Sequence, residues 1–151
     1  CNALIWRSNV RRHGNRVSNI EITDYPLPEG RYNNAKVVYS ERYHSLYGIA
    51  SGSPCVSRLD LAEHELAWKD VTARDTENGV TFRSEASCVL MDSNGEETIL
   101  CLECDSTPFY VKQFRLSDHE TSVHPAESRI CARWKHGALY DKYSGRVFVG
   151  G

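Results

Sequence analysis

The sequence predicts an α+β fold, in which helices back an antiparallel sheet of about four strands and disulfides reinforce the structure. Two segments in the first half have apolar residues at helical spacing, whereas three segments in the second half read as strands. Helices followed by a run of strands are typical of α+β proteins, because alternating α/β folds interleave the two. The chain has 151 residues, which fits a single domain over residues 1–151.

The first half begins with a strand and continues with a helix. Residues 17–23 (VSNIEIT) predict a strand, with Ile20 and Ile22 on one face. Residues 33–48 carry apolar side chains at helical spacing, with an asparagine to cap the start and Gly48 to end the helix. We expect the tyrosines of this region to line the core: Tyr32, Tyr39, Tyr43 and Tyr47.

A second helix is predicted over residues 60–71. Asp60 and Glu63 have the spacing of a capping box, in which the two residues satisfy each other's backbone N–H groups. His64 lies beside Glu63 and Glu65, and we interpret these three as the solvated side of the helix rather than as a site.

The second half changes to strand patterns. Three antiparallel strands are predicted: residues 80–91, 97–104 and 108–116. Residues 126–143 predict either a helix or a strand through 129–134 followed by a turn at Gly137. Residues 145–151 (GRVFVGG) predict the last strand.

The Asn-Gly pair at residues 94–95 joins the first two of these strands. It predicts a two-residue type I′ turn, because both positions accept positive φ. In that register Ser93 pairs with Glu96, and Cys88 faces Cys101 at a non-hydrogen-bonded pair. Cα atoms approach there to about 4.5 Å, which a disulfide tolerates. The geometry therefore predicts a Cys88–Cys101 disulfide.

The chain has six cysteines, and three pairings of the other four stay open: Cys1, Cys55, Cys104 and Cys131. A structural zinc site normally needs two Cys-x-x-Cys halves, and the chain has one, Cys101-x-x-Cys104. A redox pair usually opens a helix, whereas a strand directs these two sulfurs to opposite faces. We therefore favour disulfides over a zinc site or a redox pair.

Composition limits the compartment and the partners. An even and high number of cysteines favours an oxidising compartment, so we expect a secreted, extracellular protein. The net charge of −2 offers no basic field, so we do not expect a nucleic-acid partner. No apolar run approaches the roughly 20 residues that span a bilayer, so we expect no membrane span. Because the chain starts at Cys1, we expect that a preceding segment has been removed. The oligomeric state stays open.

The histidines do not match a metal motif. His119 and His124 are five residues apart with Glu120 between them, whereas a zinc-binding helix needs an interval of four. Pro125 follows at once, so we interpret the segment as a polar surface loop. The chain has no phosphate-binding glycine loop and no nucleophile elbow. We expect no metal and no cofactor.

The best enzyme hypothesis is a secreted ribonuclease-like hydrolase. Glu41, Arg42 and His44 resemble the glutamate, arginine and histidine that such enzymes place on a small sheet. A distant histidine would complete the set: His119, His124 or His136. The three candidates fall on the predicted helix and not on strands that would aim them together. We therefore place this hypothesis second to a non-enzymatic binding protein.

Two basic clusters contain the candidate binding residues. These residues combine arginine with tryptophan, which are enriched at interface anchors: Trp6, Arg7, Arg11, Arg12, Arg133 and Trp134. The competing interpretation is that the arginines are solvated and the tryptophans are buried in the core.

Residues 6–11 (WRSNVR) are similar to a tryptophan-arginine motif of the Leptosphaeria avirulence and suppressing family, which ends in a second arginine. The match departs at Ser8, where the family has a hydrophobic residue. The resemblance implies a small secreted effector of a plant-pathogenic fungus with a disulfide-linked α+β fold. It also implies a non-enzymatic avirulence and virulence protein that binds a host protein and is recognised by plant immunity. A structural or inhibitor protein of the extracellular space is the third class left open.

Overall fold

The computed structural model describes the backbone of residues 2–8 and 20–26, and backbone and side chains in these ranges: 36–51, 55–72, 81–82, 86–103, 109–126 and 137–150. These residues contain twelve strands and no helix. The α+β prediction is therefore wrong, and the described part of the chain is all-β.

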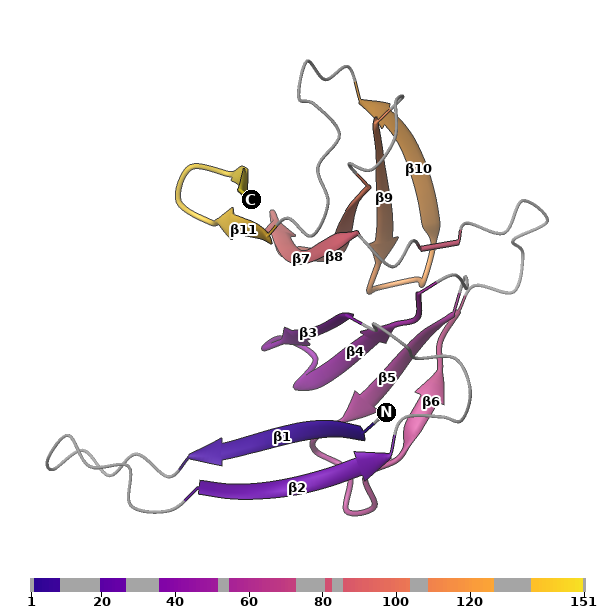
Figure 1. Cartoon of the computed structure of the whole chain (residues 1–151), viewed down its shortest axis with the longest axis vertical. Coiled ribbons are helices and arrows are strands. Elements are labelled where there is room, and N and C mark those ends of the chain that lie inside the picture. The colour runs from indigo at the N-terminus through magenta and orange to yellow at the C-terminus, as the bar shows by residue number, and fades with distance from the viewer. Residues whose placement is uncertain are drawn as a thin grey trace, which may run out of the picture.

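The strands form two four-stranded antiparallel sheets and two hairpins (Figure 1). The N-terminal hairpin pairs β1 (Asn2–Ser8) with β2 (Ile20–Pro26). The first sheet has the order β3-β4-β5-β6: β3 (Lys36–Ser40), β4 (Ser45–Ile49), β5 (Val56–Asp60) and β6 (Trp68–Asp70). The second has the order β10-β9-β8-β7: β7 (Ser87–Ser93), β8 (Glu96–Glu103), β9 (Phe109–Arg115) and β10 (Thr121–Ala126). The C-terminal hairpin pairs β11 (Gly137–Asp141) with β12 (Arg146–Gly150).

The predicted helix over residues 33–48 is instead, where it is described, the β3–β4 hairpin. Its turn spans residues 41–44, and His44 takes a φ of 45° there. Side chains alternate on each arm, so that Tyr39 is exposed whereas Tyr47 is fully buried. Because a four-residue turn separates two alternating arms, the apolar residues fall at intervals that resemble those of a helix.

The second predicted helix, over residues 60–71, is a turn between β5 and β6. Asp60 Oδ1 accepts a hydrogen bond from the Ala62 N–H at 3.0 Å, and Glu63 pairs with Lys69 at 2.5 Å instead of capping a helix. Asp side chains bond nearby backbone N–H groups both at helix starts and in turns, so the local signal did not distinguish the two.

Most strands predicted in the second half are confirmed, with shifted ends. β8, β9 and β12 occupy the expected ranges, whereas β7 begins only at Ser87. In the tail, β11 starts at Gly137 and excludes a helix from there on. The alternative strand at 129–134 lies outside the described residues. At the N-terminus, β2 begins at Ile20, within the predicted range 17–23, and β1 was not predicted.

The Asn-Gly hairpin has the predicted register. Residues 94 and 95 have φ values of 55° and 79°, as a type I′ turn requires. Ser93 pairs with Glu96, and Cys88 pairs with Cys101. A disulfide joins these two cysteines, whose Cα atoms are 4.1 Å apart. The first disulfide prediction is confirmed.

The two four-stranded sheets share one hydrophobic core. The first sheet contributes Tyr47, Ile49 and Val56, and the second contributes Ile99 and Phe114, all of which are at most 2% exposed. Phe82 adds an aromatic ring from the segment between the sheets, with Ala86, Cys101 and Leu116 completing the cluster. Burying each large apolar side chain contributes about 1.5–3 kcal/mol, so this cluster stabilises the packing of one sheet on the other.

One ion pair is buried beside the core. Lys112 Nζ on β9 lies 2.6 Å from Glu103 Oε1 on β8, and it also donates to the Thr81 carbonyl oxygen. The pair attaches the segment that carries Phe82 to the second sheet.

No helix in the described part of the chain is long and apolar enough to cross a membrane.

Candidate functional site

The predicted binding residues are not placed by the structure. Trp6 and Arg7 lie on β1, whose side chains are not described, and the other four lie outside the described residues: Arg11, Arg12, Arg133 and Trp134. The same holds for three of the cysteines: Cys1, Cys104 and Cys131. Cys55 is buried just before β5. The basic binding face therefore stays a prediction.

The described residues instead place aromatic and cationic side chains together on the β3–β4 hairpin. We call this the β3–β4 surface, and it consists of five residues: Val37, Tyr39, Arg42, Tyr43 and His44. Val37 and Tyr39 are each 46% exposed on the outward face of β3. Arg42 and His44 are exposed on the turn, and Tyr43 is half-buried against the core. Arginine and tyrosine are typical anchors of protein interfaces.

Tyr39 and the turn are joined through His44. The Tyr39 hydroxyl lies 3.2 Å from His44 Nδ1, and the two rings meet edge to face with centroids 6.3 Å apart. His44 adopts a left-handed backbone conformation that is uncommon outside glycine but in which histidine is enriched. The hairpin therefore holds the imidazole against the exposed tyrosine.

The Tyr43 ring carries two guanidinium groups. The Cζ atoms of Arg42 and Arg58 each lie 5.9 Å from its centroid, within the range of cation–π attraction. Arg42 also approaches the Asn-Gly turn of the other sheet, because a Cβ built on Gly95 would lie 3.4 Å from Arg42 Nη1. Positively charged guanidinium groups and an aromatic ring are thus combined at the β3–β4 turn.

Two buried serines fix the shape of the turn. The Ser40 hydroxyl oxygen accepts a hydrogen bond from the Tyr43 N–H at 3.0 Å, and the Ser45 hydroxyl donates to the Tyr43 carbonyl at 2.7 Å. Both serines are fully buried. Buried backbone groups need partners, and these hydroxyls supply them on both sides of the aromatic residue.

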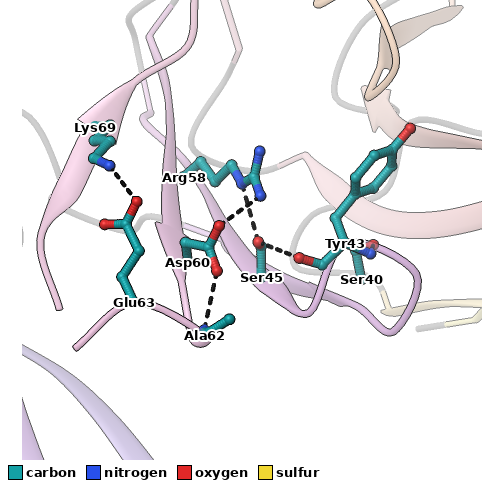
Figure 2. Close-up of polar contacts among 8 residues, drawn as sticks. All are labelled: Ser40, Tyr43, Ser45, Arg58, Asp60, Ala62, Glu63 and Lys69. Atoms are coloured by element: carbon teal, nitrogen blue, oxygen red, sulfur yellow. Dashed lines mark hydrogen bonds and ion pairs between the residues drawn. The ribbon is translucent and has the colours of Figure 1, made fainter. Parts of the chain in front are cut away.

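Arg58 on β5 also supports this turn, through a hydrogen bond to Ser45. Figure 2 shows its guanidinium between Ser45 and Asp60, with Nε donating to Ser45 Oγ at 3.0 Å and Nη2 to Asp60 Oδ2 at 2.8 Å. Residues 58 and 60 share a face because side chains alternate along a strand. Figure 2 also shows Glu63 and Lys69 as a separate pair beyond Asp60.

The network continues into the second sheet. The Ser40 hydroxyl donates to Glu97 Oε2 on β8, and Glu97 is 7% exposed. Tyr47 lies in the same neighbourhood, and its hydroxyl has no hydrogen-bond partner in the described structure. Burial raises the pKa of Tyr47, and the positive charge of Arg58 opposes that effect in part. This network joins the backbone of the β3–β4 turn to both sheets.

In the part of the chain that the structure describes, the residues of the ribonuclease hypothesis are not brought together. Glu41, Arg42 and His44 lie in a turn, and not on a helix as predicted. His119 stacks on the Phe114 ring with centroids 5.8 Å apart. His124 Nε2 lies 3.1 Å from the Ser122 hydroxyl. No contact within the described part of the chain joins His44 to either of these histidines, and His136 lies outside it.

Histidine also occupies the glycine-like position of a second turn. Three four-residue turns end in a positive φ: His44 at 45°, His119 at 62° and Gly145 at 66°. His119 lies in the turn before β10 and His124 lies on β10, so residues 121–126 form a strand and not the predicted surface loop. Across the residues described, no group of three or more His, Cys, Asp or Glu side chains is arranged to hold a metal ion.

Sequence reasoning missed the β3–β4 surface, because it assigned Tyr39 to the core face of a helix, whereas the core assignment of Tyr43 agrees with its packing. Periodicity gave no signal for the surface, because Val37, Val38 and Tyr39 are consecutive apolar residues. Comparison of the chain with protein-family models, with curated proteins and with solved structures found no match. The β3–β4 surface is therefore interpreted from its own geometry.

Proposed function

We propose that the chain is a secreted, disulfide-reinforced binding protein of the effector type, which acts by contacting a host protein and not by catalysis. One observation carries the proposal. Val37 and Tyr39 remain half-exposed on β3 beside a turn whose backbone is bonded by the buried Ser40 and Ser45 hydroxyls. Tyrosine and arginine are among the residues that are enriched at interface hot spots.

The oxidised cysteine pair supports an extracellular location. Cys88 and Cys101 are bonded across neighbouring strands, and disulfides persist in oxidising compartments such as the extracellular space. The proposal of a plant host rests on a different basis, the similarity of residues 6–11 to the avirulence motif. It does not rest on the α+β architecture, which the described strands contradict.

The state of the polar side chains supports recognition over catalysis. Arg58 is bound by Asp60 and Ser45, and Glu97 is bound by Ser40. A general acid or base needs a free position in reach of substrate. In the network these groups bind one another, so their observed role is to position the turn.

The test compares capture of host proteins by matched variants. The oxidised wild-type protein, a Tyr39→Ser/Arg42→Ser variant and a Val123→Ser control are immobilised and exposed to extracellular fluid from plant tissue. Val123 is 40% exposed on β10, so the control removes comparable apolar surface elsewhere. We expect a host protein that the wild type and the control retain and the double variant loses.

Three outcomes would redirect the proposal. Equal capture by all three proteins would remove the β3–β4 surface, and loss with Arg11→Glu/Arg12→Glu alone would assign binding to the predicted basic face. RNA cleavage by the wild type that disappears in His44→Ala would replace recognition with the ribonuclease alternative. Thermal unfolding of each variant separates lost binding from lost folding.

A further inference from the structure

Among the described strands, the C-terminal strand β12 is an edge strand that contains no proline. In the described part of the chain it pairs with β11 alone. β11 itself lies against β7, where the Tyr140 hydroxyl donates to the Asp92 carbonyl at 2.8 Å. Another edge strand, β10, contains Pro125, which cannot donate to a further strand. β12 (RVFVG) has no proline and is rich in β-forming residues.

The outward face of this hairpin is apolar. Leu139 on β11 and Phe148 on β12 are cross-strand partners, 67% and 55% exposed. Next to them Gly137 pairs with Gly150, and these glycines line a shallow hollow that is open to solvent. Leu139 and Phe148 also line that hollow. An apolar face that adjoins an open strand edge marks an association site.

The hairpin carries an acidic and a basic side chain near its turn, Asp141 and Arg146. The Asp141 carboxylate accepts hydrogen bonds from the Ser144 hydroxyl and the Tyr143 N–H, and these bonds lower its pKa. Arg146 is exposed at the start of β12 and has no ion pair in the described structure. Because side chains alternate along a strand, Arg146, Phe148 and Gly150 share the outward face of β12. Their side chains decrease in size along the strand, from a charged arginine through phenylalanine to glycine, which has none.

We infer that β12 pairs antiparallel with β12 of a second copy of this chain, across a two-fold axis at Phe148. This register sets Phe148 opposite Phe148 of the second copy and Arg146 opposite Gly150 of the second copy. The arginine of each copy then lies over the hollow left by the glycine of the other. The two Arg146 residues are about 14 Å apart along the strand, beyond the screening length of about 8 Å. The strand is therefore complementary to itself in size, and the register keeps the two like charges apart.

The expected assembly is a reversible dimer. An isologous contact is closed, so pairing stops at two copies. Two five-residue strands and the flanking Leu139 side chains bury less than the ~1,200 Å² at which stable interfaces begin. The dimer should accordingly form with rising protein concentration instead of persisting on dilution. This inference is independent of the proposed host-binding function, because it rests on a different hairpin.

The test is the mass of the oxidised protein in solution from about 10 µM to 1 mM, measured by sedimentation velocity; this range brackets a weak interface. We expect the wild type to shift from monomer to dimer. Phe148→Lys and Phe148→Glu should each stay monomeric, because like charges would meet at the axis, and a 1:1 mixture of the two should dimerise again. Val123→Lys, on the proline-protected strand β10, should dimerise as the wild type does.

The mixture also controls for folding, since two misfolded variants would not restore a dimer. A wild type that stays monomeric at 1 mM would overturn the inference. So would a dimer that persists in Phe148→Lys, or two monomeric variants whose mixture remains monomeric.

Discussion

The Ser40 hydroxyl donates a hydrogen bond to Glu97 Oε2 and so joins the two four-stranded sheets through residues 57 positions apart in the chain. The same hydroxyl accepts the Tyr43 N–H, so one buried oxygen connects the sheet interface to the β3–β4 turn. Stability and the shape of the candidate surface are therefore coupled at Ser40.

Replacement of Ser40 by alanine should destabilise the protein. Both Glu97 and the Tyr43 N–H would lose a buried partner, and each unsatisfied buried group costs about 1–3 kcal/mol. The free energy of unfolding from urea titration measures the loss. Ser117→Ala is the control, because Ser117 donates to Glu96 at an exposed site, and it should change stability by less than about 0.5 kcal/mol. Equal losses in the two variants would contradict a special role for Ser40.

Tyr47→Phe should be neutral or stabilising at neutral pH, because it removes a buried hydroxyl with no hydrogen-bond partner in the described structure. The pKa of Tyr47 is raised in the folded state, chiefly by burial, above its ordinary value of 10.0. The unfolded chain therefore loses the tyrosine proton first, and this contribution to stability is present below pH 10.0 and falls as the pH rises further. Between about pH 9 and 11, the free energy of unfolding should fall less steeply with pH for the variant than for the wild type. Parallel slopes would refute this assignment.

Lys112→Met should cost about 3–5 kcal/mol, because it leaves the buried Glu103 carboxylate without its lysine partner. The double variant Lys112→Met/Glu103→Leu should recover much of the loss, since it removes both charges together. Arg115→Met offers a surface comparison, with ion pairs to Asp118, Glu120 and Glu96 that are exposed to solvent. We expect its effect to be much smaller than that of Lys112→Met, and denaturant titration ranks the three variants.

Removal of the strand-to-strand disulfide by Cys88→Ala/Cys101→Ala should lower stability by about 3 kcal/mol, because the bond closes a loop with a sequence separation of 13. Peptide mapping of the non-reduced wild type should recover residue 88 linked to residue 101. The intact mass should lie six hydrogens below that of the reduced protein if the other four cysteines of the six also pair. Native protein that reacts with a thiol reagent at Cys88 would disprove the pairing.

Local chemistry was sufficient to predict the Asn-Gly hairpin. Positive φ at residues 94 and 95 sets a two-residue turn, the turn sets the register, and the register brings Cys88 to Cys101. Each step depends on neighbours in the chain, so no distant contact was needed. The last strand, at residues 145–151, was predictable for the same reason, because Gly145 ends the preceding turn and β-forming residues follow.

Only the tertiary structure decided the first half. The turn at 41–44 ends in His44, so no glycine or asparagine marked the hairpin in the sequence. Its turn conformation is held by Ser40 and Ser45, and Ser40 in turn depends on Glu97 from the other sheet. Helical and hairpin spacing of tyrosines look alike along the chain, and the choice between them is made by which side chains the second sheet can bury.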